Sequence, residues 1–257
     1  MFFSRYGELK KVLVLISFVC LFLLYQYGRS IWYPEMIKFT GKQTVAEVIE
    51  KLEVEVKQEL TPLFLAKGIS FPPKNLSLIA FKDSKELEVW ASNEDKIFQL
   101  ITSYNVKAAS GVLGPKLIEG DKQVPEGLYK IEGFNPNSSY HLSMKLNYPN
   151  AFDLRHAKNE GRASPGTNIF IHGRAASIGC LAMGDPVIEN LFYLVHATGL
   201  SNTQVIISPT NPSLNELSIP NGSPVWVGDL YKDIVNEYST VTKNLVSSLK
   251  CNNSSYS

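Results

Sequence analysis

The chain has 257 residues, of which 44% are hydrophobic and 19% charged, so it can bury a core and is not disordered as a whole. Its 25 Lys and Arg against 24 Asp and Glu give a net charge of +1, which argues against a nucleic-acid-binding protein held by phosphate contacts. Three cysteines exclude a dense disulfide scaffold and leave at least one thiol unpaired.

The first thirty residues differ from the rest of the chain. Arg5, Lys10 and Lys11 precede an apolar run over residues 12–27, which is the pattern of a secretory signal or a membrane anchor. We expect an uncleaved anchor within residues 1–30, because no small-residue cleavage site follows the run. A cleaved signal and a buried core helix are the alternatives. Positive charge ahead of the run predicts that the body of the protein lies outside the cytosol.

Residues 31–75 form a predicted helical linker region. Thr44 and Glu47 have the spacing of a capping box, which marks the start of a helix. Apolar residues then recur at helical intervals, at Val45, Ile49, Leu52, Val56, Leu60 and Leu63. The helix ends before Pro72 and Pro73.

Residues 76–210 form the predicted catalytic domain, and residues 211–257 a C-terminal extension and tail. Alternating apolar residues predict a strand meander over 76–82, 86–91 and 98–104, and further strands over 127–133, 140–146, 168–172, 204–208 and 224–227. Helices are expected over 185–196 and 229–249. Many strands with few helices favour a mainly β fold of the α+β class over a doubly wound sheet.

The stretch from Ile169 to Asp185 is where chemistry is expected. A buried strand delivers His172, and a loop of small residues returns to Cys180 just before a predicted helix N-terminus. The positive end of a helix and a neighbouring imidazole both favour the reactive thiolate. His172 would accept the thiol proton, and the N–H groups of Gly179 and Cys180 would stabilise an oxyanion. Taken alone, the pair is also consistent with a structural cysteine and a chance histidine.

This stretch resembles the L,D-transpeptidase catalytic domain of the YkuD type, and within it the YafK-related subgroup. The resemblance covers about residues 76–208. It rests on the string His-Gly…Ser-x-Gly-Cys and on upstream segments, which are Gly114-Pro115-Lys116, Glu119-Gly120-Asp121, Pro125-Glu126-Gly127-Leu128-Tyr129 and Leu146-Asn147-Tyr148-Pro149-Asn150. It implies a β-rich catalytic domain. The amphipathic helix predicted within residues 31–75 precedes that domain, and the helix predicted over 229–249 follows it.

The resemblance also implies residue roles. Cys180 matches the family's nucleophile and His172 its base, and thioester chemistry on peptidoglycan stem peptides follows from the family. The substrate- or oxyanion-binding candidates are Gly173, Ser177, Gly179 and Arg174. The chain departs from the wider family in three ways: Ile178 replaces a usual His, Ala182 replaces a frequent Arg, and the loop from His to Cys is shorter. These departures concern acceptor recognition, so transfer and hydrolysis both stay open.

Other residues are weaker candidates. His156 follows Asp153-Leu154-Arg155 in a predicted loop and is a candidate substrate contact, whereas His196 is expected on the outer side of a helix. Arg155 and Arg162, like Arg174, have the group that pairs with carboxylates, although surface charge is the plainer interpretation. A glycosidase pair among Glu119, Asp121 and Glu126 is disfavoured, because these residues sit in turns.

We therefore expect an enzyme of the bacterial cell envelope, anchored in the inner membrane with its body in the periplasm. It would remodel the cell wall by acyl transfer on peptidoglycan stem peptides. The alternatives are hydrolysis by the same site, an inactive wall-binding module, and a protease of ordinary proteins. No cofactor or metal is expected, and neither nucleotide nor nucleic acid, because no glycine-rich phosphate loop and no further Cys/His group is present.

Overall fold

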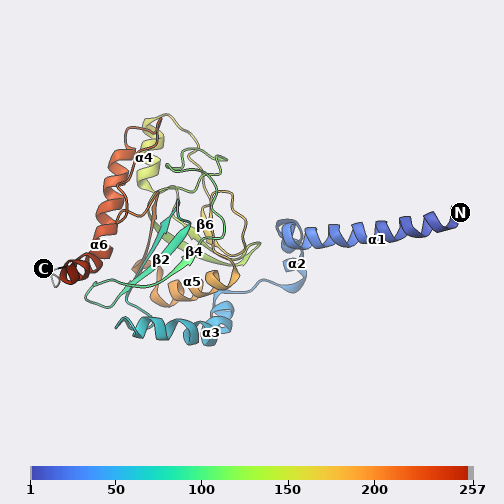
Figure 1. The fold of residues 1–257 in the computed structure, drawn as a ribbon, viewed down its shortest axis with the longest axis horizontal. Coiled ribbons are helices and arrows are strands. Elements are labelled where there is room, and N and C mark those ends of the chain that lie inside the picture. The colour runs from blue at the N-terminus through green and yellow to red at the C-terminus, as the bar shows by residue number, and fades with distance from the viewer. Residues whose placement is uncertain (1, 254–257) are drawn as a thin grey trace.

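An eight-stranded mixed sheet forms the centre of the protein (Figure 1). The structure is a computed structural model and describes residues 2–253. The strand order is β3-β2-β1-β8-β4-β5-β6-β7. The strands are β1 (Asn75–Phe81), β2 (Glu86–Ser92), β3 (Gln99–Asn105), β4 (Gly127–Ser138), β5 (His141–Leu146), β6 (Phe170–His172), β7 (Leu181–Ala182) and β8 (Thr203–Ser208).

Helices lie on both faces of this sheet and also precede it in the chain. The helices are α1 (Phe2–Tyr27), α2 (Arg29–Thr40), α3 (Val45–Leu65), α4 (Ala151–Asn159), α5 (Asp185–Thr198) and α6 (Val227–Asn253), with a short 3-10 turn, η1 (Leu200–Asn202). Figure 1 shows α3 and α5 together on one side of the sheet, α6 on the other, and α1 extending away from the body. The architecture is thus of the expected α+β class.

Successive side chains of the central strands point into two different hydrophobic cores. Leu78 of β1 packs into the core beneath α3 and α5, with Phe64 and Phe192, whereas its neighbour Ile79 packs into the core beneath α6. Both β1 residues are fully buried, because successive side chains of a strand point to opposite faces and helices cover each face. Burying a side chain of this size contributes about 1.5–3 kcal/mol.

Most of the expected elements are confirmed. The meander forms as the antiparallel ladder β3-β2-β1. The capping box of Thr44 and Glu47 starts α3, and α5 ends at Gly199. The sequence did not predict the long-range pairings of β8. This strand lies between β1 and β4, parallel to β1 and antiparallel to β4.

Two local expectations were wrong. The segment 224–227 is no strand: Val225 is fully exposed, the Val227 N–H donates to the Pro224 carbonyl in a turn, and α6 begins there. His156 lies within α4 rather than in a loop. That helix begins at Asn150, whose side-chain oxygen accepts the N–H groups of Phe152 and Asp153.

The anchor expected within residues 1–30 is not supported. Among the residues that the structure describes, no helix combines the length and the apolar character needed to cross a membrane. The apolar run over residues 12–27 is short against the about 20 residues of a membrane-spanning helix.

Candidate active site

His172 and Cys180 lie at neighbouring parallel strands and line one cavity. Strand β6 pairs with β7 so that Ile171 is opposite Leu181, and these two buried side chains face the core. Because side chains alternate along strands, His172 and Cys180 face the other side together. The cavity there, which we call the catalytic cavity, has a volume of about 240 Å³. It is lined by Asn135, Ser138, Ser139, Tyr140, Ser143, Phe170, His172, Ala176, Ile178 and Cys180.

The backbone fixes which nitrogen of His172 carries hydrogen. Nδ1 lies 2.6 Å from the carbonyl oxygen of Gly173. A carbonyl has no proton to donate, so Nδ1 is the protonated nitrogen and Nε2 keeps its lone pair when the ring is neutral. Burial lowers the pKa of His172 below its ordinary value, and the hydrogen bond to Gly173 opposes that shift. The imidazole is therefore a neutral base at pH 7.

Tyr140 packs against the imidazole ring of His172. Its ring lies against the ring of His172, with centroids 4.7 Å apart. Ser143 of β5 is opposite His172 in the sheet register and also lines the catalytic cavity. Sequence analysis did not single out either residue, because nothing in a strand sequence says which neighbour it will pair with.

The thiol of Cys180 is half-buried and protonated at rest. Burial raises its pKa above the ordinary value, while a hydrogen bond to the backbone of Phe170 and the positive charge of Lys116 act in the opposite direction. The sequence predicts a helix N-terminus next to this thiol, but β7 and Gly184 precede α5. The thiol therefore needs a base, and the helix is not its immediate neighbour along the chain.

The two expected oxyanion donors both bond to hydroxyl groups. The N–H of Cys180 donates to Ser177 Oγ at 3.1 Å, and the Ser177 hydroxyl donates to the Cys180 carbonyl at 2.6 Å. The N–H of Gly179 donates to Ser110 Oγ at 2.6 Å. Gly179 has φ +102°, a backbone conformation that favours glycine. Ser177 thus closes the turn that presents the thiol, and substrate contact by Ser177 or Gly179 stays a prediction.

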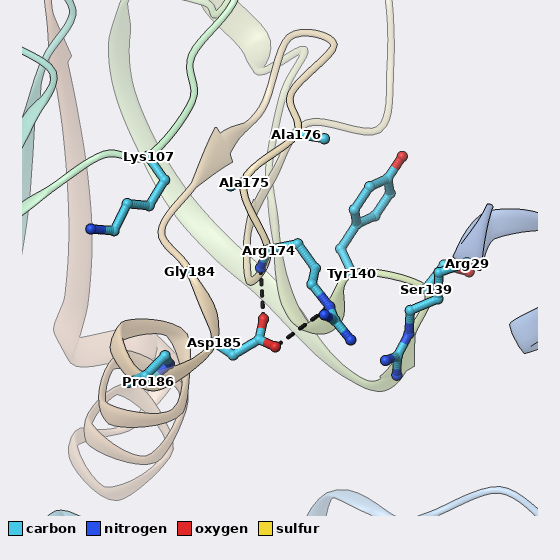
Figure 2. A pocket seen from close by; sticks show the side chains of 10 residues that line it. All are labelled: Arg29, Lys107, Ser139, Tyr140, Arg174, Ala175, Ala176, Gly184, Asp185 and Pro186. Carbon is cyan, nitrogen blue, oxygen red and sulfur yellow. Dashed lines mark hydrogen bonds and ion pairs between the residues drawn. The ribbon is translucent and has the colours of Figure 1, made fainter. Parts of the chain in front are cut away.

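Glycine at position 173 is required by close packing. A Cβ there would lie 2.7 Å from Asp185 Oδ1 and 2.7 Å from the carbonyl oxygen of Tyr140. The next residue, Arg174, has φ +60°, which is uncommon for a residue other than glycine. Asp185 holds it there: its Oδ1 accepts the Arg174 N–H at 2.7 Å, and its Oδ2 lies 3.4 Å from Arg174 Nε (Figure 2).

A buried ion pair anchors the loop that carries Ser110. This loop, residues 106–126, joins β3 to β4. Glu126 Oε1 lies 2.9 Å from Lys82 Nζ and accepts the N–H of Gly114 at 2.7 Å, while Oε2 accepts the Tyr231 hydroxyl at 2.8 Å. Lys82 also donates to the carbonyls of Gly114 and Val124. The loop is therefore tied at its base to Lys82, directly after β1, and to α6, and Ser110 connects it to the turn of residues 177–180.

The remaining candidates lie elsewhere. His156 stacks on Trp226, with ring centroids 4.7 Å apart. Arg162 pairs with Glu160 at 2.7 Å, and Arg155 is exposed on α4. None of the three candidates lines the catalytic cavity. Among the side chains that the structure describes, no group of three His, Cys, Asp or Glu is placed to hold a metal ion.

The comparisons identify the class to which this fold and site belong. Residues 78–227 match the model of the YkuD family, the L,D-transpeptidase catalytic domain, and the chain belongs to that family. Over 154 residues it is 31% identical to the protein named "Putative L,D-transpeptidase YafK" of Escherichia coli K12, a match of 57% of this chain and 60% of that protein. The chain thus spans less than two thirds of the length of that relative.

Solved structures give a more distant likeness. One is the helical cell shape determining protein Pgp2 of Campylobacter jejuni, with a TM-score of 0.43, 21% identity, and coverage of 53% of this chain and 48% of that one. Another is Bd1075 of Bdellovibrio bacteriovorus, with a TM-score of 0.39, 22% identity, and coverage of 55% and 50%.

Proposed function

We propose that the protein is a cysteine-dependent acyltransferase of the bacterial envelope that acts on peptidoglycan stem peptides. The observation that carries the proposal is the placement of a neutral His172 and a protonated Cys180 on one side of the sheet, around one cavity. Family membership supplies the substrate class. Because peptidoglycan lies in the envelope, we place the catalytic domain there too.

The first half of the reaction forms a thioester. Nε2 of His172 takes the proton of the Cys180 thiol, and Sγ attacks the carbonyl carbon of an amide that links two stem residues. The tetrahedral oxyanion collapses, the C–N bond breaks, and the imidazolium returns the proton to the leaving amine. For the N–H groups of Gly179 or Cys180 to stabilise the oxyanion, they must lengthen their bonds to Ser110 or Ser177.

The second half releases the acyl group. An amine of a second stem attacks the thioester, His172 takes its proton, and the C–S bond breaks to give a new cross-link. Water in place of the amine gives hydrolysis and a released stem.

Incubation of the full chain with purified muropeptides, followed by mass analysis, tests the proposal. A new dimer indicates transfer, and loss of a terminal residue or an attached group indicates hydrolysis. Cys180→Ser abolishes both on this mechanism, because a hydroxyl is far harder to ionise than a thiol. Cys251→Ser is the matched control and leaves the rate unchanged. Retained turnover in the Cys180→Ser protein would overturn the mechanism, and an inert wild-type chain that still binds the muropeptides would favour a wall-binding module.

A further inference from the structure

The hairpin between β4 and β5 contains a residue with a left-handed backbone that the proposed mechanism does not use. Ser139 and Tyr140 form its turn, and Figure 2 shows the Tyr140 side chain projecting from it. Ser138 pairs with His141 to close the turn. His141 has φ +73°, in a region that few residues other than glycine adopt. A backbone of this kind persists where the surrounding structure imposes it, so a contact must hold His141 in place.

Helix α5 supplies that contact. Nε2 of His141 lies 2.6 Å from Oε1 of Glu189, and both side chains are partly buried. A carboxylate has only acceptor atoms, so the imidazole donates this hydrogen bond. Glu189 lies about one helical turn after Asp185, whose carboxylate holds the backbone of Arg174. Two carboxylates on one face of α5 thus fix the β4–β5 hairpin and the loop that follows His172.

The same hairpin packs directly on His172 and Gly173. The Tyr140 ring lies against the imidazole of His172, with centroids 4.7 Å apart. The Leu142 carbonyl accepts the N–H of Gly173 at 3.1 Å, and the carbonyl of Gly173 accepts the hydrogen bond of His172 Nδ1. His141 is the residue between Tyr140 and Leu142, the two that make these contacts. A displacement of His141 would therefore be passed to the imidazole of His172 from both sides.

We propose that the pair of His141 and Glu189 positions the imidazole of His172. It acts through Tyr140, and it sets the direction in which Nε2 of His172 faces the thiol of Cys180. Such geometry matters, because a displacement of about 1 Å can cost about a hundredfold in rate. Neither member of the pair lines the catalytic cavity, so both are positioning residues. The inference rests on the proposed function, in which His172 is the base.

A spectroscopic measurement on the full chain tests the position of the ring. The ring current of Tyr140 displaces the proton resonance of the His172 imidazole, and His172→Ala identifies that signal by its loss. Tyr140→Leu marks where the signal lies without the aromatic ring. We expect His141→Asn and Glu189→Ala to move the signal toward that position. Asn adopts a left-handed backbone more readily than most residues, so His141→Asn removes the contact with Glu189 without adding backbone strain.

The rate of Cys180 alkylation by iodoacetamide at pH 7 tests the chemical consequence. General-base assistance contributes about 10²–10⁴-fold, so a misplaced imidazole should slow the reaction by about tenfold or more in both variants. Glu189→Gln keeps an acceptor oxygen and should stay close to wild type. Glu132→Ala is the matched control. It breaks the more exposed pair of Glu132 with Lys145 on the same two strands, and it should change neither measurement.

An unmoved signal in His141→Asn and Glu189→Ala overturns the inference, whatever the rate. So does a moved signal with an unchanged rate when His172→Ala slows alkylation, and so does a Glu189→Gln protein as impaired as Glu189→Ala. If circular dichroism shows that Glu189→Ala does not fold, His141→Asn and Glu189→Gln decide the question. An unchanged rate in His172→Ala refutes the proposed base alone, and the signal of His172 then decides whether the pair positions its ring.

Discussion

Breaking the ion pair of Lys82 and Glu126 should destabilise the protein severely. The two side chains are only 5% and 0% exposed, and Glu126 also accepts hydrogen bonds from Gly114 and Tyr231. Glu126→Leu leaves a buried ammonium, a backbone N–H and a hydroxyl without their acceptor. Loss of one partner of a buried pair costs about 3–5 kcal/mol, and we expect the upper part of that range because of the two further donors.

The matched comparison is the double variant Lys82→Met/Glu126→Leu. It removes the stranded charge together with its partner, so it should recover about 2 kcal/mol relative to Glu126→Leu alone. Lys232→Met provides the exposed control, since the pair of Lys232 with Asp229 is 76% exposed on both sides and should matter by less than about 1 kcal/mol.

Urea titration followed by circular dichroism measures these free energies of unfolding, provided that the transitions are two-state. A loss below 1 kcal/mol for Glu126→Leu would refute the reasoning, as would a double variant no more stable than the single one. Either result would mean that the charges are solvated or that the site relaxes around the change.

Three further predictions concern the site and the pH dependence. His172→Ala should slow alkylation of Cys180 by iodoacetamide at pH 7, and since burial lowers the pKa of His172, wild-type reactivity should persist somewhat below pH 6.5; unchanged kinetics would mean that another group takes the proton. Ser110→Ala should lower kcat more than it changes KM, because it removes the hydroxyl that holds the turn of residues 177–180 in place through Gly179; an unchanged kcat in steady-state assays would contradict this. Burial raises the pKa of Asp153 from 3.8 to about 6, so its ionised form destabilises the fold, and the stability that the wild type has at pH 4 is lost as pH rises to 6. Asp153→Asn should therefore gain about 1–3 kcal/mol over wild type between pH 4 and pH 7 in urea titrations, and a gain that shrinks over that interval would contradict the sign.

Local sequence patterns predicted most of the helices and strands, but not which strands pair with one another. The capping box at Thr44 and the apolar spacing behind it are contained in one short window of sequence, and α3 forms there. The strand expected at 224–227 failed because one apolar residue, Val227, is the buried start of α6 rather than part of an alternating face. Helix α4 was missed because it is short and buries one residue, Ala157, so its cap at Asn150 was the main signal.

The candidate site also combines residues that a local motif identifies with residues that only the fold brings together. His172 and Cys180 are eight positions apart, and a sequence motif is enough to single them out as a pair. Ser110 meets Gly179 from 69 positions away, and Ser143 lies opposite His172 on the neighbouring strand β5. Contacts of that range depend on which strands pair and where a helix docks, and a single sequence holds no local signal for either.

The parallel pairing of β6 with β7 has a consequence for how this active site diversifies. Two parallel neighbours require the chain to leave one end of the first strand and return to the start of the second, and here residues 173–179 make that return. The proposed base, His172, ends β6 before the loop, and the proposed nucleophile, Cys180, comes after the loop and directly before β7. At the outer part of the loop, Ala175, Ala176 and Ile178 are exposed. Insertions at that tip would reshape the cover of the catalytic cavity without moving His172 or Cys180, so access to the proposed site could change while the two side chains stay in register.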